Sequence, residues 1–374
     1  MSLSHVPLFD QLLERSPRIP ATSVLIGINL LIFAATVWHG AGLWHSNNSV
    51  QLAWGANFGP ATKDGEWWRL GSALFLHFGL FHLGMNMLSL WDGGRLVERM
   101  FGSGRFLLIY FSSGLAGNLL SLIVQGDRAI SGGASGAIFG VYGALMSYLW
   151  LERHGLHPAE FKRLFWGAAI LSAITIVLGF QITGIDNGAH IGGLLGGILT
   201  GLALARPVHP APRPRRIGQR VAGFALILAI TQLIVLIPAP RYRWSDELRA
   251  QEQISEFLGE DARISARWGA ILGRARGEEA SFDQLAGQIE TQVASQYEGS
   301  FEQLSRLRVN PALPSAPTLA ALRDYAEQRR DASRALVEGL RANDPEQIRE
   351  SLQDARQAAK RVAPRVGGSE AAKP

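Results

Sequence analysis

Seven apolar stretches, each long enough to cross a lipid bilayer, constrain the fold of this 374-residue chain more than any other feature. A membrane helix needs roughly 17 to 25 such residues, because lipid offers the main chain no hydrogen-bond partner. The predicted spans are residues 21–38, 70–91, 106–124, 135–151, 164–180, 189–205 and 221–237. The sequence therefore predicts an all-α fold, a polytopic helical bundle whose partner is the lipid bilayer.

The distribution of positive charge predicts how this bundle is oriented. Thirteen lysines and arginines precede the first span or lie in the second-to-third, fourth-to-fifth and sixth-to-seventh connections, whereas the opposite connections hold three. Lys and Arg favour the cytoplasmic side. We expect a cytoplasmic N-terminus and, because the number of spans is odd, a C-terminal domain that is periplasmic or extracellular. The first span is longer than the apolar region of a cleaved signal peptide, which favours a signal anchor.

Composition divides the chain further. We expect a cytoplasmic segment at 1–20, a six-helix core at 21–205, a basic, proline-containing linker at 206–220 and a seventh membrane helix at 221–238. Residues 239–365 carry apolar side chains at helical spacing, which predicts an extramembrane helical domain of unknown role and partner, followed by a disordered tail at 366–374. The net charge of +5 does not indicate nucleic-acid binding, because the basic residues lie mostly between apolar spans.

A Gly-Gly-Ala-Ser-Gly run containing Ser135 opens the fourth predicted span. Its glycines permit a sharp turn, and the N–H groups at a helix start are suited to a developing oxyanion. A serine in this position can also simply cap the helix, and glycine beside it can serve helix packing. The run alone leaves both interpretations open.

His190 lies just inside the sixth predicted span, where a polar side chain is costly unless it faces protein or water. Glycines four residues apart on the fourth and sixth spans should let these helices approach closely. Both helices start on the same side of the membrane, so a hydrogen bond between Ser135 and His190 is geometrically natural. In isolation, such a histidine could equally be a haem ligand or a packing residue.

Polar side chains also interrupt the second predicted span. His82 and Asn86 share one helix face, and an imidazole and a carboxamide can both donate hydrogen bonds to an oxyanion. His77 lies about 140° from His82 around a helix, so we interpret it as structural. No Asp or Glu lies inside the spans, which favours a Ser135–His190 dyad over a triad.

Other intramembrane chemistries find less support in the sequence. There is no His-Glu-x-x-His motif for a zinc protease and no pair of intramembrane aspartates. A haem held by His82 and His190 would leave Ser135 and Asn86 unexplained. The absence of cysteine excludes disulfides and thiolate metal sites. We therefore expect no metal and no cofactor.

Taken together, these motifs resemble those of the rhomboid intramembrane serine proteases, over residues 20 to 205. The run around Ser135 is similar to the Gly-x-Ser-Gly of that family, and His190 falls in its Ala-His-x-x-Gly. His82 and Asn86 fit its His-x-x-x-Asn, whose side chains join the nucleophile's N–H in an oxyanion hole. The residues that the resemblance implies to be structural supports are Trp68, Arg69, Glu98, Arg105, Gly133, Gly136, Phe139 and Gly193.

The resemblance implies a serine endopeptidase that cleaves transmembrane segments of single-span membrane proteins through an acyl-enzyme, in a bacterial inner (plasma) membrane. Ser135 would be the nucleophile and His190 the general base, with Phe139 stacked on the histidine. The alternative is a catalytically silent, rhomboid-like scaffold that binds membrane helices. A small-solute transporter would need inverted repeats and a polar midplane site, and the sequence shows no convincing repeat.

Overall fold

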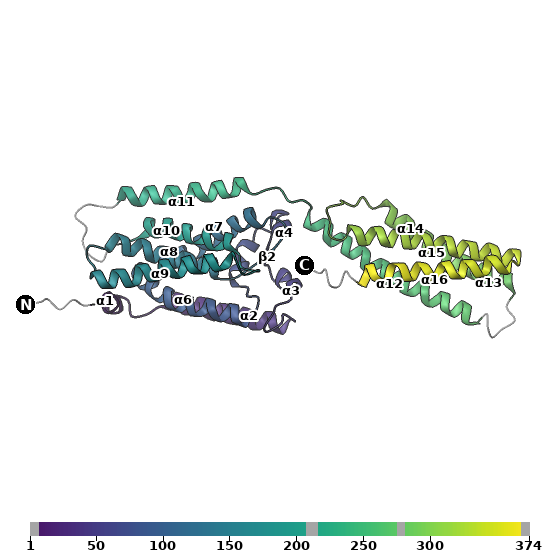
Figure 1. The fold of residues 1–374 in the computed structure, drawn as a ribbon, viewed down its shortest axis with the longest axis horizontal. Coiled ribbons are helices and arrows are strands. Elements are labelled where there is room, and N and C mark those ends of the chain that lie inside the picture. Colours follow the sequence, from purple (N-terminus) through teal and green to yellow (C-terminus); the bar gives the residue numbers. More distant parts are fainter. Residues whose placement is uncertain (1–6, 207–215, 275–280, 368–374) are drawn as a thin grey trace, which may run out of the picture. The chain divides into compact units, whose positions relative to one another are not determined.

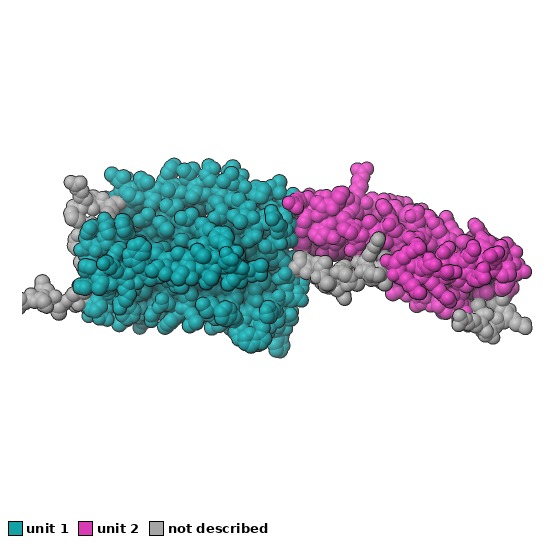
Figure 2. Space-filling view, in the orientation of Figure 1, with its two compact units in different colours: residues 1–240, 374 teal, residues 241–373 magenta. Residues whose placement is uncertain are grey.

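The computed structural model describes residues 7–206, 216–274 and 281–367, which are mostly helical (Figure 1). The all-α prediction is confirmed. The chain divides into two compact units, Met1–Pro240 and Arg241–Lys373 (Figure 2). The elements of the first unit are α1 (Leu8–Arg15), α2 (Pro20–Trp38), α3 (Asn48–Ala53), β1 (Asn57–Phe58), α4 (Gly59–Lys63), α5 (Arg69–Ser72), η1 (Ala73–Phe75), α6 (Leu80–Phe101), α7 (Ser103–Gln125), β2 (Ile130–Ser131), α8 (Ser135–Glu152), α9 (Pro158–Gly179), α10 (Asn187–Leu204) and α11 (Arg216–Leu236). Those of the second unit are α12 (Trp244–Arg274), α13 (Phe282–Ile289), η2 (Glu290–Ala294), α14 (Ser295–Arg306), α15 (Ala316–Ala342) and α16 (Pro345–Gly367).

Five described helices, α2, α7, α9, α10 and α11, are long and apolar enough to cross a membrane, so the chain is an integral membrane protein. The short α5–η1 pair and α6 together could form a sixth span, but they meet at an angle of 92°. The prediction of one continuous helix over 70–91 is therefore wrong. Gly79, with a φ of 141°, precedes the true helix start at Leu80, and α6 continues to Phe101.

Helix α8 matches the fourth predicted span but differs in character from the five apolar helices. Most of its residues are buried by protein, so it can carry more small and polar side chains than a helix that faces lipid. Helix α10 packs most extensively on α7 and α8, and α11 runs along one side of this group (Figure 1). The three helices α7, α8 and α10 thus form the centre of the first unit.

Glycine allows α8 and α10 to touch main chain to main chain. A Cβ atom on Gly193 would collide with the carbonyl of Gly136, and one on Gly197 would collide with that of Gly140. Farther along, a Cβ on Gly201 would lie 2.7 Å from the Cα of Ala144. The predicted glycine ridges are confirmed, and they hold the two helices in one register.

The structure extends helices into several of the segments predicted to lie outside the bundle. The segment at 1–20 contains α1, whose Leu8 and Leu12 belong to the hydrophobic core of the first unit. Most of the predicted linker at 206–220 lies outside the described residues, although α11 already begins at Arg216. Val366 and Gly367, predicted as disordered, belong to α16, and residues 368–374 lie outside the described part.

The second unit is organised around a buried polar cluster. The hydroxyls of Tyr297 and Tyr325 both donate to Asp261 Oδ1, at 2.7 and 2.8 Å, and the guanidinium of Arg329 lies over the rings of Tyr297 and Trp268. Burial raises the pKa of both tyrosines above the ordinary value, and the nearby Asp261 carboxylate acts in the same direction. Their protonated forms therefore stabilise the fold below pH 10, and this contribution is lost as the pH rises through the folded-state pKa values.

We expect Gly197→Ala to lower the free energy of unfolding of the first unit, the membrane unit, by about 1–3 kcal/mol, because the added methyl group overpacks the α8–α10 contact. Gly167→Ala on α9 is the matched control, since a Cβ at Gly167 meets nothing within 4 Å. Thermal unfolding in detergent, followed by far-UV circular dichroism, measures the difference. Equal unfolding temperatures for the two variants would contradict this account of the helix contact.

We also expect Tyr325 to stay protonated at pH 11 in the folded protein, well above the ordinary tyrosine pKa of about 10. Absorbance at 295 nm, titrated from pH 8 to 11, should therefore rise equally in the parent and in Tyr325→Phe. In denaturant the variant should lose about one sixth of the amplitude, since the chain has six tyrosines. A similar loss in the folded state would show that Tyr325 ionises normally.

Candidate active site

Two helices bring the predicted serine and histidine together at their N-terminal ends. Ser135 is the first residue of α8, and His190 lies in the first turn of α10. His190 Nε2 lies 3.0 Å from Ser135 Oγ. The N-cap position of α8 is occupied by Ala134, so Ser135 is not the residue that caps this helix.

The imidazole of His190 is held by packing on a neighbouring ring. Phe139, one turn along α8 from Ser135, stacks on it with ring centroids 4.4 Å apart and planes inclined by 16°. The side chain of His190 is buried, with 6% of its surface exposed. Within the described residues, His190 Nδ1 has no hydrogen-bond partner. The arrangement is a serine–histidine pair without a carboxylate on the far nitrogen.

His82 and Ser135 both lie close to Gly133. Its Nδ1 accepts a hydrogen bond from the main-chain N–H of Phe78 at 3.4 Å, which leaves Nε2 to carry the proton of a neutral ring. A Cβ built on Gly133 would lie 2.9 Å from His82 Nε2 and 3.7 Å from Ser135 Oγ. Gly133, with a φ of 142°, therefore leaves open a small space that the imidazole and the hydroxyl both border.

Asn86 and His77 are placed differently from His82. Asn86 is buried one turn farther along α6, where its Nδ2 donates to the carbonyl of His82 at 2.9 Å. In this position its amide bonds within its own helix rather than to Ser135. His77 is buried before α6, and its ring stands edge-on to that of His82 with centroids 5.1 Å apart.

Ser135 also offers a main-chain donor. The first N–H groups of a helix have no acceptor within the helix, and Ser135 begins α8. The preceding turn is fixed by a hydrogen bond of 2.8 Å from the N–H of Gly133 to the carbonyl of Ala73. The N–H of Ser135 and the Nε2–H of His82 are thus two candidate donors near the serine hydroxyl.

The predicted supports Trp68 and Arg69 hold the segment before α5. Arg69 is buried, and its Nη1 donates to the carbonyls of Leu52 and Ala56 at 2.6 and 3.2 Å. Its guanidinium also lies over the ring of Trp68, 4.8 Å from the centroid. One arginine therefore bonds to carbonyls of both the short α3 helix and the loop after it.

Glu98 and Arg105 lie at the opposite end of α6 from His82. The buried Glu98 carboxylate accepts the N–H groups of Ala21 and Thr22 at 2.9 and 2.8 Å, and so caps α2. It also accepts the hydroxyl of Ser103 at 2.7 Å. Arg105 donates to the carbonyl of Phe101 at 3.3 Å. These contacts fix helix ends far from the serine, which agrees with a supporting role.

One acidic residue of the site, Asp186, was not predicted from the sequence. It is the N-cap of α10, and its Oδ1 accepts the N–H of Ala189 at 3.0 Å. Its Oδ2 accepts the hydroxyls of Ser121 and Ser131 at 2.5 and 2.6 Å. An acidic residue just before an apolar helix is a recognisable N-cap signal, but the two serines are distant in sequence and gave none.

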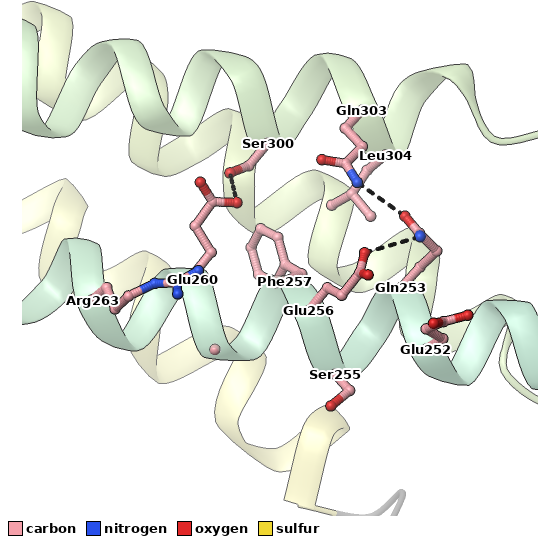
Figure 3. Close-up of a pocket in the computed structure, with 11 residues that line it drawn as sticks. Glu252, Gln253, Ser255, Glu256, Phe257, Glu260, Arg263, Ser300, Gln303 and Leu304 are labelled. Carbon is pink, nitrogen blue, oxygen red and sulfur yellow. Dashed lines mark hydrogen bonds between the residues drawn. The ribbon is translucent and has the colours of Figure 1, made fainter.

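A separate hollow of about 660 Å³ lies on the second unit, between α12 and α14 (Figure 3). Glu252, Glu256 and Glu260 line it from successive turns of α12. Two hydrogen bonds cross it, from Ser300 to Glu260 and from Gln303 to Gln253. Its lining has two serines, Ser255 and Ser300, but no histidine, so it lacks the serine–histidine pair found in the first unit.

Comparisons with known proteins agree with the geometry of the first unit. A family model described as the Rhomboid domain matches residues 64–207. The chain is 34% identical to "Rhomboid protease GluP" of Bacillus subtilis over 266 residues, which cover 71% of this chain and 49% of that protein. It is 35% identical to "Putative rhomboid protease YdcA" of the same organism over 170 residues, which cover 46% of this chain and 80% of that protein. "RHOMBOID-like protein 5" of Arabidopsis thaliana is 38% identical over 158 residues, 41% of this chain and 50% of that protein.

Proposed function

Since this chain belongs to the rhomboid family, we propose that it is an intramembrane serine endopeptidase that uses Ser135 as nucleophile and His190 as general base. Its similarity to proteins named as rhomboid proteases supports proteolysis within a membrane. The observation that carries the assignment of residues is the contact of 3.0 Å between Ser135 Oγ and His190 Nε2. Polar side chains within membrane segments are energetically costly, so a serine and a histidine that meet at the ends of two buried helices favour a functional role.

In the proposed reaction, His190 Nε2 accepts the hydroxyl proton as Ser135 Oγ attacks a peptide carbonyl. The carbonyl oxygen becomes an oxyanion, which the main-chain N–H of Ser135 and the Nε2–H of His82 stabilise. Removal of one such donor typically costs about 2.7–4 kcal/mol of transition-state stabilisation. Asn86 Nδ2 donates one of its two hydrogens to the carbonyl of His82, and the second hydrogen is the third donor that we propose for the oxyanion.

Collapse of the tetrahedral intermediate breaks the peptide C–N bond, and His190 gives its proton to the departing amine. The acyl-enzyme then reacts with water, which His190 activates by the same proton transfer in the second half of the reaction. The stacked ring of Phe139 keeps the imidazole facing Ser135 throughout. No residue of this scheme requires a metal or a cofactor.

The substrates we propose are single-span membrane proteins, cut near the outer end of the transmembrane helix. The serine lies at the helix end that the positive-inside rule assigns to the outer side. A helical substrate hides its carbonyls in its own hydrogen bonds, so the cut segment must unwind first, and helix-breaking residues near the cut should assist. The proposed location is a bacterial inner membrane, with the N-terminus cytoplasmic and the second unit outside.

We expect Ser135→Ala and His190→Ala to abolish cleavage of a single-span substrate in proteoliposomes, and Ser135→Ala to abolish labelling by a fluorophosphonate. Ser147→Ala is the matched control, because Ser147 lies on the same helix but bonds only to main-chain carbonyls. The control should retain both activities. A parent protein that neither cleaves nor labels would instead favour a catalytically silent scaffold.

The proposed orientation can be tested with single cysteines, because the chain has none of its own. We expect Ser255→Cys, on the exposed face of α12, to react with a membrane-impermeant maleimide in intact bacterial spheroplasts. Arg153→Cys, just after α8, should react only after the membrane is permeabilised. The opposite pattern of labelling would reverse the orientation.

A further inference from the structure

One carboxylate connects the segment before Ser135 to the helix that carries His190. Asp186 Oδ1 accepts the N–H of Ala189, and the Asp186 carbonyl accepts the N–H of His190 at 3.2 Å. Asp186 Oδ2 accepts the hydroxyl of Ser131 at 2.6 Å. A single residue thus bonds to the base's own turn of helix and to a serine four positions before the nucleophile.

The segment that contains Ser131 is itself rigidly held. Ser131 is in β2 and pairs with Asn57 of β1, and its side chain is largely buried. The following turn is fixed at Gly133 by its hydrogen bond to Ala73. A displacement of Ser131 would therefore be passed along a short, constrained path to Ser135.

Asp186 has a third partner, which holds the carboxylate itself in place. Ser121 of α7 is almost fully buried and donates to the same Oδ2 as Ser131, at 2.5 Å. Close contact at this position is also required on the helix side, because a Cβ on Gly188 would lie 3.1 Å from the Cα of Ser121. The carboxylate therefore joins three separate segments, namely α7, β2 and the first turn of α10.

We propose that Asp186 is a positioning residue that sets the register between Ser135 and His190, which deepens the proposed function and rests on it. His190 Nδ1 has no hydrogen-bond partner in the described part of the chain, so no hydrogen bond to this nitrogen fixes the orientation of the imidazole. Its location depends instead on the start of α10 and on the stacked Phe139. Asp186 fixes that start relative to the nucleophile's segment, and it does so without contact to the reacting atoms.

The chemistry of the network requires a carboxylate at this position. Three donors, two hydroxyls and one N–H, converge on two oxygens that can only accept. Asp186→Asn keeps an acceptor for the N–H of Ala189, and with it the helix cap, but places an NH₂ donor where the serine hydroxyls donate. Ser131→Ala keeps the whole carboxylate and its cap, and removes only the connection to the nucleophile's segment.

The test compares kcat, KM and the rate of fluorophosphonate labelling for Asp186→Asn, Ser131→Ala and the double variant, at a temperature where all remain folded. We expect kcat and the labelling rate to fall about 10- to 100-fold with KM unchanged, because misplacement of a reacting group by about 1 Å can cost that much. The double variant should lose no more than Asp186→Asn alone, since both changes break the same connection.

Ser112→Ala is the matched control, because Ser112 and Thr200 form another hydroxyl hydrogen bond between α7 and α10, at 3.0 Å. It should leave kcat within about threefold of the parent even if it lowers the unfolding temperature. Parent-like kcat in Ser131→Ala would overturn the positioning role alone, provided that Ser135 is required for activity. A parent without Ser135-dependent activity would overturn the proposed function and this proposal with it.

Discussion

The contact between α8 and α10 is the constraint on which the rest of the membrane unit depends. Glycines on both helices bring their main chains together, so that carbonyl oxygens of one helix approach the Cα atoms of the other. Such contacts replace the hydrophobic effect, which cannot drive helices together in lipid. Because these helices start at the same level, a tight fit along their length also fixes the distance between Ser135 and His190. Packing and the candidate chemistry therefore share one set of residues.

Three charged side chains of this unit bind where helices begin and end. Glu98 caps α2, Asp186 caps α10, and Arg69 satisfies carbonyls of a short helix and its loop. Each of these groups would be expensive in lipid if it were unpaired. Here each one accepts or donates several hydrogen bonds, while uncharged polar side chains within α2, α7 and α10, such as Asn29, Asn118 and Thr200, donate to main-chain carbonyls. These three charged groups of the first unit thus secure the boundaries of helices.

Hydropathy predicted the all-α fold and most of the membrane helices, because the bilayer imposes a length and a composition that can be read locally. The prediction of one straight helix failed at residues 70–91, because apolar content does not show where a helix bends. The break before Leu80 depends on the conformation of a single glycine, Gly79. The Ser135–His190 contact was predictable from the glycine spacing and the shared direction of two helices. The Asp186 network was not, because its serines precede it by 55 and 65 residues and only folding brings them together.

The cap on α2 has a consequence for how this protein is assembled. The first membrane helix to leave the ribosome receives its N-terminal hydrogen bonds from Glu98, which lies 77 residues farther along the chain than Ala21. Until that glutamate is synthesised, the N–H groups at the start of α2 must be satisfied by water at the membrane surface. The final contacts at the start of α2 therefore form only after α6 has been synthesised.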